Sequence, residues 1–192
     1  VGKELDSLTD VISFGVAPSF VMYFWAINEI GKFGWMFVLI YTVCCALRLA
    51  RFNLTNIEET ESWKINFFEG VPSPAAAGLI LLPLILYLSD LIKFENISII
   101  SSVVILITSI LMVSKIPTYS LKRILIPRNL TIFLLLGIGI YLSLIIFYTF
   151  ETLFLTGLIY IILIPISFFH FRYLNKKSLT TIHEEEETED VL

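Results

Sequence analysis

Hydrophobic and polar residues follow one another along this chain in long blocks, and six of the blocks are apolar. A helix needs about 20 mostly apolar residues to cross a hydrocarbon core of about 30 Å. Polar, Pro- or Gly-containing connectors separate the apolar blocks, which cover residues 11–27, 33–50, 75–91, 97–113, 131–149 and 153–169. The pattern predicts an all-α fold, a polytopic transmembrane helical bundle, because open strands would leave backbone groups unpaired in lipid.

Composition supports a membrane location and excludes an ordinary soluble domain. Hydrophobic residues make up 57% of the chain and charged residues only 16%, and soluble domains contain roughly 25% charged residues. Cys44 and Cys45 are adjacent in an apolar block, so we expect them to pack rather than to form a disulfide or bind a metal. The net charge of -4 reflects an acidic segment from Glu184 to Asp190, so the global charge says nothing about partners. We expect membrane lipids as partners and no nucleic acid.

Lysine and arginine residues are distributed unevenly between the two sides of the predicted bundle. If the six blocks cross the membrane alternately, Lys32 and Lys93 lie on one side and the other eleven of the 13 basic residues lie on the opposite side. By the positive-inside rule the richer side is cytoplasmic, which places Asp6, Asp10 and both chain ends there.

Three regions follow from this threading. We expect residues 1–113, with the first four spans, to form a catalytic core, residues 114–174 to add two further spans, and residues 175–192 to form an acidic, disordered cytoplasmic tail. Pro72 and Pro74 precede the third span and end any helix before it. The small residues that follow, 75–78, predict close packing between helices.

Gly2, Asp6 and Asp10 are the first candidates for chemistry. Their spacing of four places them on one helical face, about 6 Å apart along the axis. Two stacked carboxylates suit a divalent cation such as Mg²⁺ or Mn²⁺, which prefers hard oxygen ligands and shares them with substrate phosphates. The alternative is that acids in a first helical turn only interact favourably with the helix dipole.

Basic residues near the predicted cytoplasmic surface are candidates for binding anions. Arg48 and Arg51 share a helical face, where they serve either as snorkelling anchors or as ligands of a lipid phosphate or a serine carboxylate. Lys122 and Arg123 lie in the next cytoplasmic connector, together with Arg128, and there the alternatives are anionic headgroups or substrate.

Several segments resemble one protein family. Gly2-x-x-x-Asp6-x-x-x-Asp10 is similar to the closing half of the CDP-alcohol phosphatidyltransferase signature, D-x-x-D-G-x-x-A-R-(x)8-G-x-x-x-D-x-x-x-D. Residues 14–18 (FGVAP), 47–53 (LRLARFN) and 70–76 (GVPSPAA) resemble the phosphatidylserine synthase branch of that family. The similarity covers roughly the first 80 residues and fades beyond them.

The resemblance implies a reaction and roles for individual residues. CDP-diacylglycerol and L-serine would react with the help of Mg²⁺ or Mn²⁺, giving phosphatidylserine and CMP. Asp6 and Asp10 would bind metal, Asp10 would also act as the catalytic base, and Gly2 would line the nucleotide site. The resemblance also implies a bacterial inner (cell) membrane, contact with membrane lipids, and a homodimer.

The family's first two aspartates and its A-R pair would lie just upstream of Val1. We therefore expect the chain to begin partway through a longer product, with about two further spans upstream, and we expect this chain alone to be inactive. Three alternatives remain: a related transferase with another alcohol acceptor, an inactive remnant, and a transporter or channel subunit with the charged residues lining an ion path. Clustering of the charged residues at one membrane face disfavours the transporter.

Overall fold

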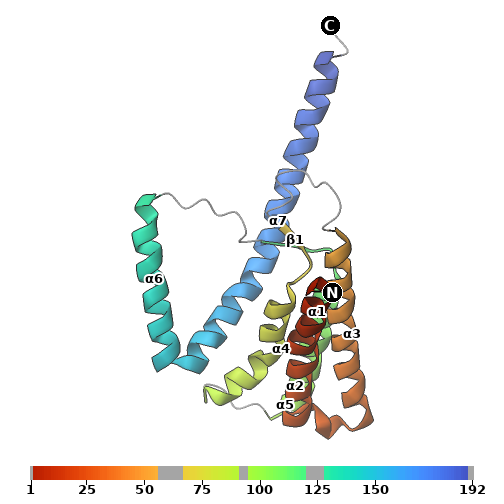
Figure 1. Ribbon diagram of the computed structural model, residues 1–192, viewed down its shortest axis with the longest axis vertical. Helices are drawn as coiled ribbons and strands as arrows, with labels where there is room; N and C mark the ends of the chain where they lie inside the picture. Colours follow the sequence, from red (N-terminus) through yellow and green to blue (C-terminus); the bar gives the residue numbers. More distant parts are fainter. Residues whose placement is uncertain (1, 56–66, 91–94, 120–127, 190–192) are drawn as a thin grey trace.

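The computed structural model describes residues 2–55, 67–90, 95–119 and 128–189, and within them the fold is an all-α bundle, as predicted (Figure 1). The first helical rod consists of α1 (Gly2–Asp10), η1 (Val11–Val16) and α2 (Ala17–Trp25). The short η2 (Ile27–Ile30) leads into α3 (Lys32–Thr55). The remaining helices are α4 (Ser73–Leu88), α5 (Ile97–Val113), α6 (Arg128–Phe147) and α7 (Thr149–Glu189).

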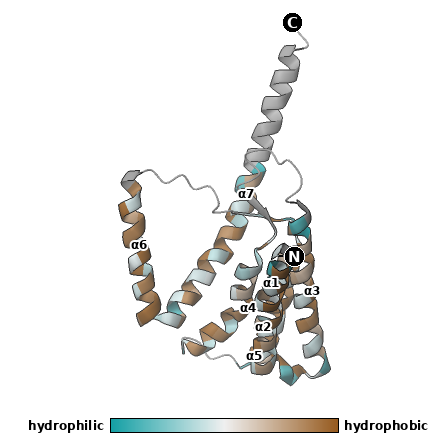
Figure 2. Cartoon of the chain, viewed as in Figure 1, coloured by the Kyte–Doolittle hydropathy of each residue, from teal (hydrophilic) through white to brown (hydrophobic). Residues whose placement is uncertain are grey.

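Each of the six predicted apolar blocks contains a helix in the part of the chain that the structure describes. By length and composition, four helical segments of the described chain can cross a membrane: Glu4–Trp25, Lys32–Asn53, Leu130–Phe147 and Thr149–Arg172. The other two helices, α4 with 16 residues and α5 with 17, are apolar but shorter. Hydrophobic residues predominate along these helices (Figure 2), and many apolar side chains of α6, such as Ile132, Phe133 and Leu135, are exposed.

The first helix begins earlier than the hydropathy pattern indicates. We expected the span to start at Val11, but the rod is already helical at Gly2. No proline or strong turn signal interrupts residues 2–10, so the helix continues through this polar stretch. The candidate residues therefore belong to the same rod as the first span.

The helices alternate in direction, and this brings distant connectors to one end of the bundle. The start of α1, the end of α3 and the start of α4 lie on the same side, together with the end of α5 (Figure 1). This arrangement agrees with the alternating threading used to assign the basic residues to one side.

A two-stranded antiparallel sheet joins two connectors at this end, and the sequence analysis did not anticipate it. Strand β1 (Phe67–Glu69) pairs with β2 (Pro117–Tyr119), and Phe68 lies opposite Thr118. Strands of three residues are too short to show a two-residue hydrophobic period. The sheet links the approach to α4 with the segment that follows α5.

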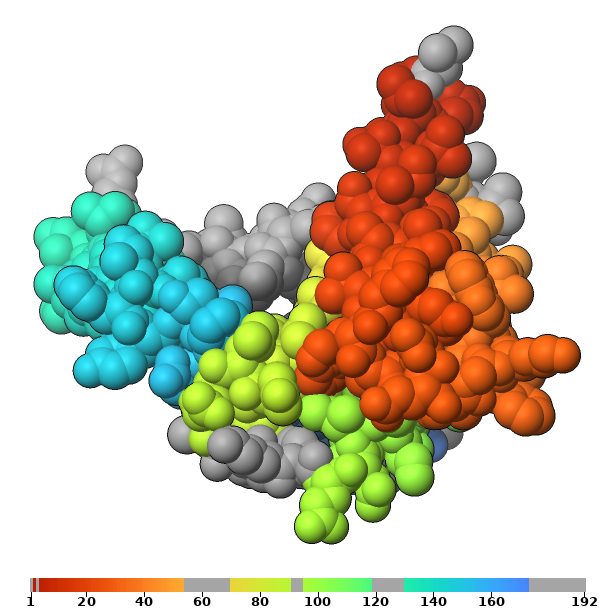
Figure 3. All heavy atoms as spheres, turned by 90° about the horizontal axis from the view of Figure 1, so that it is seen from below, coloured from red at the N-terminus to blue at the C-terminus, as the bar shows by residue number. Residues whose placement is uncertain are grey.

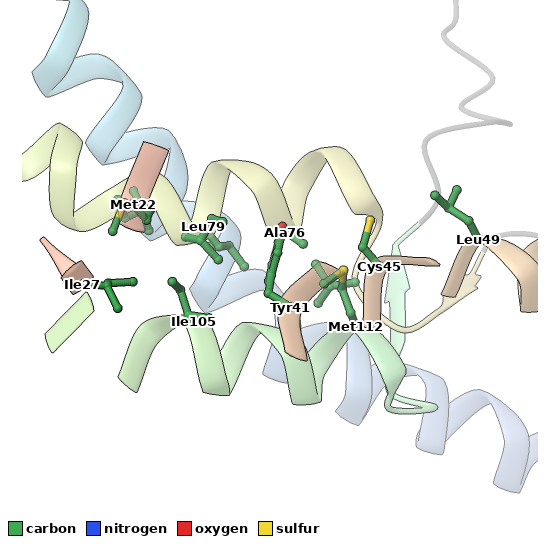
Figure 4. Packing of buried hydrophobic residues seen from close by; sticks show 12 residues of the cluster. Met22, Ile27, Tyr41, Cys45, Leu49, Ala76, Leu79, Ile105 and Met112 are labelled. Atoms are coloured by element: carbon green, nitrogen blue, oxygen red, sulfur yellow. The ribbon is translucent and has the colours of Figure 1, made fainter. Parts of the chain in front are cut away.

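Side chains of α3, α4 and α5 form the centre of the core. Tyr41, Ala76 and Met112 are almost completely buried, one from each helix, and they approach one another in Figure 4. Cys45 is also buried in this cluster and Cys44 is partly buried. Both cysteines are free, in agreement with the packing role predicted for them.

The rod changes to π-helix directly after Asp10, where α3 packs closely against it. Pro18 has no N–H to donate to the carbonyl of Phe14, and the Tyr41 hydroxyl of α3 donates to that carbonyl at 3.0 Å. A Cβ added at Gly15 would lie 3.2 Å from the Cys45 sulfur. Short π segments occur frequently at functional sites, and this one adjoins the candidate carboxylate Asp10.

Helices α6 and α7 form a hairpin on the far side of the bundle from α1 (Figure 3). The Tyr141 hydroxyl and Thr156 Oγ1 are 3.2 Å apart across it. Helix α7 continues to Glu189, so residues 175–189 are helical in the structure, whereas the sequence analysis predicted a disordered tail. Extending an existing helix avoids the cost of nucleation, and the tail has no proline or glycine to stop it.

Candidate functional site

Asp6 and Asp10 lie on one helix, one turn apart, as the spacing predicted. Asp6 is exposed and Asp10 is half-buried. Asn53, near the end of α3, donates from Nδ2 to Ser7 Oγ at 2.8 Å. This hydrogen bond fixes α1 against α3 between the two carboxylates, so that their position depends on the packing of both helices.

Arg48 lies among residues from four helices. Its Nη1 donates to Ser73 Oγ at 3.0 Å. Asp10 and Tyr160 both lie within electrostatic range of the guanidinium. The Nε of Arg48 is closed off from solvent and has no hydrogen-bond partner among the described residues. Arg48 therefore lies near the candidate base Asp10 with part of its donor capacity unused.

Arg51 has different contacts from Arg48, although the sequence places both on one face. Its Nη1 donates to the carbonyl of Val113 at 2.9 Å, and Val113 is the last residue of α5. Carbonyl groups at a helix C-terminus lack intrahelical partners and attract positive charge. This contact favours a role for Arg51 in joining α3 to α5. Lys122 and Arg123 lie outside the described residues, so their predicted roles stay predictions.

Gly2 lies one turn before Asp6, and a Cβ added to it would meet no atom within 4 Å. The space in front of Gly2 is open, so a bulky group could lie against the backbone there. The role of Gly2 beside a nucleotide stays a prediction. The open space also means that a methyl group at this position would disturb no contact of the described residues.

We therefore expect Gly2→Ala to raise the KM for CDP-diacylglycerol about tenfold, since one misplaced methyl group costs this much in a fitted site. The midpoint of thermal unfolding should stay unchanged. Gly139→Ala is the matched control, because a Cβ at Gly139 also meets nothing within 4 Å and α6 is remote from α1. Equal KM values for Gly2→Ala and the unsubstituted protein would remove Gly2 from the nucleotide site.

The donor chemistry of α1 fits a hard divalent cation, but the number of ligands is incomplete. Asp6 and Asp10 offer carboxylate oxygens, which Mg²⁺ and Mn²⁺ prefer. The described residues contain no group of three or more His, Cys, Asp or Glu side chains that could hold a metal ion. The two aspartates therefore fit as part of a ligand set and not as a complete one.

Sequence reasoning missed two residues near Arg48. Ser73 was read only as part of a similar segment, and Tyr160 was read only as part of the sixth apolar block. Tyr160 lies 112 positions beyond Arg48 in the chain, and no local pattern signals that α7 would bring it close. A polar hydroxyl within an apolar span was the only available signal.

Taken together, the apolar helices and the charged residues at one end define an integral membrane protein with a polar site beside the helix ends. The chain belongs to the CDP-alcohol phosphatidyltransferase family, whose family model matches residues 1–114. Members of this family generally use divalent metal ions. The resemblance noted in the sequence is thereby confirmed.

Several curated relatives carry the name CDP-diacylglycerol–serine O-phosphatidyltransferase. The protein of this name from Mycobacterium leprae is 30% identical over 175 residues, covering 91% of this chain and 58% of the relative. Its counterpart in Helicobacter pylori (strain ATCC 700392 / 26695) is 37% identical over 145 residues, covering 75% of this chain and 57% of the relative. The chain thus spans somewhat more than half the length of these relatives.

Proposed function

We propose that this protein transfers a phosphatidyl group from CDP-diacylglycerol to the hydroxyl of L-serine, giving phosphatidylserine and CMP in phospholipid biosynthesis. The observation that carries the proposal is the position of Asp10, a half-buried carboxylate on the helix that matches the family signature, within electrostatic range of Arg48. Family membership supports the reaction type, and the names of the relatives support serine as the acceptor.

Asp10 is assigned the role of general base. The serine hydroxyl is a weak nucleophile at neutral pH, so a positioned carboxylate must take its proton. The serine oxygen then forms a bond to the phosphorus that carries diacylglycerol. The bond from this phosphorus to the oxygen of CMP breaks, and CMP leaves with the electron pair. The proton remains on Asp10 until it is released to solvent.

Asp6 and Asp10 would contribute carboxylate ligands to the divalent metal that the family uses. When bound, the metal neutralises phosphate charge and stabilises the attacking and leaving oxygens. Gly2 would line the nucleotide site, since the space in front of it is open. Lys122 and Arg123 are proposed to attract the lipid phosphate.

The proposed location is a bacterial inner membrane with the site facing the cytoplasm. The excess of basic residues on the side of Asp6 and Asp10 supports this orientation. Nucleotide-activated lipid and free serine would both reach the site from that side. Within the chain, residues 1–113 are proposed as the catalytic core.

Assaying the full-length protein with CDP-diacylglycerol and a divalent metal tests the acceptor directly. Serine, glycerol 3-phosphate and inositol are offered in parallel, and CMP release and the lipid product are measured. We expect turnover with serine and at most trace turnover with the other two. Turnover with glycerol 3-phosphate or inositol but not with serine would overturn the serine assignment. The reaction type of the family would still hold.

A further inference from the structure

Two buried donors, one on α3 and one on α7, have no hydrogen-bond partner among the described residues. Arg48 Nε and the Tyr160 hydroxyl are both closed off from solvent, and neither forms a hydrogen bond within the described part of the chain. The two residues interact electrostatically, so they lie in one neighbourhood. Buried polar groups in proteins are nearly always paired, and unpaired donors at one place indicate a missing acceptor.

Close packing of α7 on α4 brings Tyr160 to this position. Gly157 lies one turn before Tyr160, and a Cβ at Gly157 would come within 2.4 Å of Leu82 on α4. The absence of a side chain at Gly157 therefore lets the two helices approach. Tyr160 and Ile164, on the same face of α7, both pack against the core.

We propose that Arg48 Nε and the Tyr160 hydroxyl together bind the carboxylate of the amino-acid acceptor. This inference rests on the proposed function and assigns the acceptor site to α3 and α7. Tyr160 lies beyond the residues 1–114 that match the family model. Ser73 accepts a hydrogen bond from Arg48 Nη1, which orients the guanidinium. Arg48 Nε therefore remains for the ligand.

The position of the two donors favours a carboxylate over a phosphate. In serine, the carboxylate and the hydroxyl are separated by two carbon atoms, so a group that binds one end must lie close to the base that serves the other. Asp10 is the carboxylate that interacts electrostatically with Arg48, which makes it the candidate base for a serine bound there. A planar guanidinium also matches a carboxylate well.

Tyr160→Phe in the full-length protein tests the proposal, because it removes one hydroxyl and keeps the ring that packs on the core. We expect the KM for serine to rise about tenfold or more, as for loss of a hydrogen bond to a charged group. The KM for CDP-diacylglycerol and the thermal midpoint should stay unchanged. Tyr141→Phe is the matched control, since the Tyr141 hydroxyl lies 3.2 Å from Thr156 Oγ1 in the α6–α7 hairpin.

A second measurement separates the carboxylate from other parts of serine. Ethanolamine has the hydroxyl and the amine but no carboxylate, so Tyr160→Phe should reduce the preference for serine over ethanolamine. Arg48→Lys should also reduce the preference for serine over ethanolamine. In the double variant this preference should fall by less than the product of the two single reductions, because both groups bind one ligand. If Tyr160 had only a structural role, Tyr160→Phe would leave the preference for serine unchanged, and its effect would be independent of Arg48→Lys.

Two results would overturn the inference. One is an unchanged serine KM in Tyr160→Phe, and the other is a raised KM for CDP-diacylglycerol alone, which would assign the two donors to the lipid phosphate. If either result is found while the unsubstituted protein still turns over serine, the proposed function remains valid and only the acceptor site is rejected. No serine turnover by the unsubstituted protein rejects the proposed function itself.

Discussion

Asp10→Asn is expected to lower kcat by about a thousandfold in the full-length protein, because it removes a general base and a carboxylate ligand together. Asparagine has nearly the shape of aspartate, so the helix and its packing should persist. It cannot take a proton from serine at neutral pH. CMP release measures the loss, and the thermal midpoint of the purified protein in detergent shows whether the fold is intact.

Two further variants separate the roles of Asp10. Asp6→Asn should weaken metal binding, and added Mg²⁺ or Mn²⁺ should restore part of its activity. Asp10→Asn should not be restored by metal, because the proton acceptor is missing. Asp90→Asn is the control, since Asp90 is exposed at the opposite end of α4 and its φ of 55° is one that asparagine also tolerates. Turnover of Asp10→Asn near that of the unsubstituted protein would remove Asp10 as base.

Gly70→Ala is expected to destabilise the protein by about 3 kcal/mol, from backbone strain and overpacking together. Gly70 has a φ of 74°, which side chains rarely adopt, and an added Cβ would lie 2.6 Å from the carbonyl oxygen of Met112. The same glycine donates to the Ile116 carbonyl at 2.9 Å and accepts from Thr118 Oγ1 at 2.9 Å. A shift here would disturb the β1–β2 sheet. A lowered thermal midpoint would show the effect.

Gly78→Ala provides the matched control for this prediction. Gly78 lies within α4, and a Cβ there would meet no atom within 4 Å. Alanine favours a helix over glycine by up to about 1 kcal/mol, so this substitution should raise the midpoint or leave it unchanged. If both variants changed stability equally, the steric argument for Gly70 would be wrong.

The sequence predicted the helices well because hydropathy acts locally. Each apolar block became a helix, since a chain in lipid must satisfy its own backbone hydrogen bonds. The start of the first helix was predicted late, because a hydropathy window detects the membrane and not the end of a helix. The β1–β2 sheet was missed, since its strands pair residues 67–69 with residues 117–119.

The candidate site was predictable where its residues follow helical spacing. Asp6 and Asp10 were found in this way, and their position on one helix is confirmed. The environment of Arg48 was not predictable, because it depends on the packing of α7 on α4. The two arginines shared a face in the sequence, but only the structure separates them, with Arg48 bonded to Ser73 and Arg51 to Val113.

The unbroken rod from Gly2 to Trp25 couples the carboxylates to the bilayer. Asp6 and Asp10 are not on a loose loop, so their height above the lipid surface is set by how the rod is tilted. A thicker or thinner bilayer changes the tilt of spanning helices. Membrane thickness therefore changes the position at which the two carboxylates meet the substrate. Lipid composition, which sets this thickness, becomes a determinant of the site's geometry.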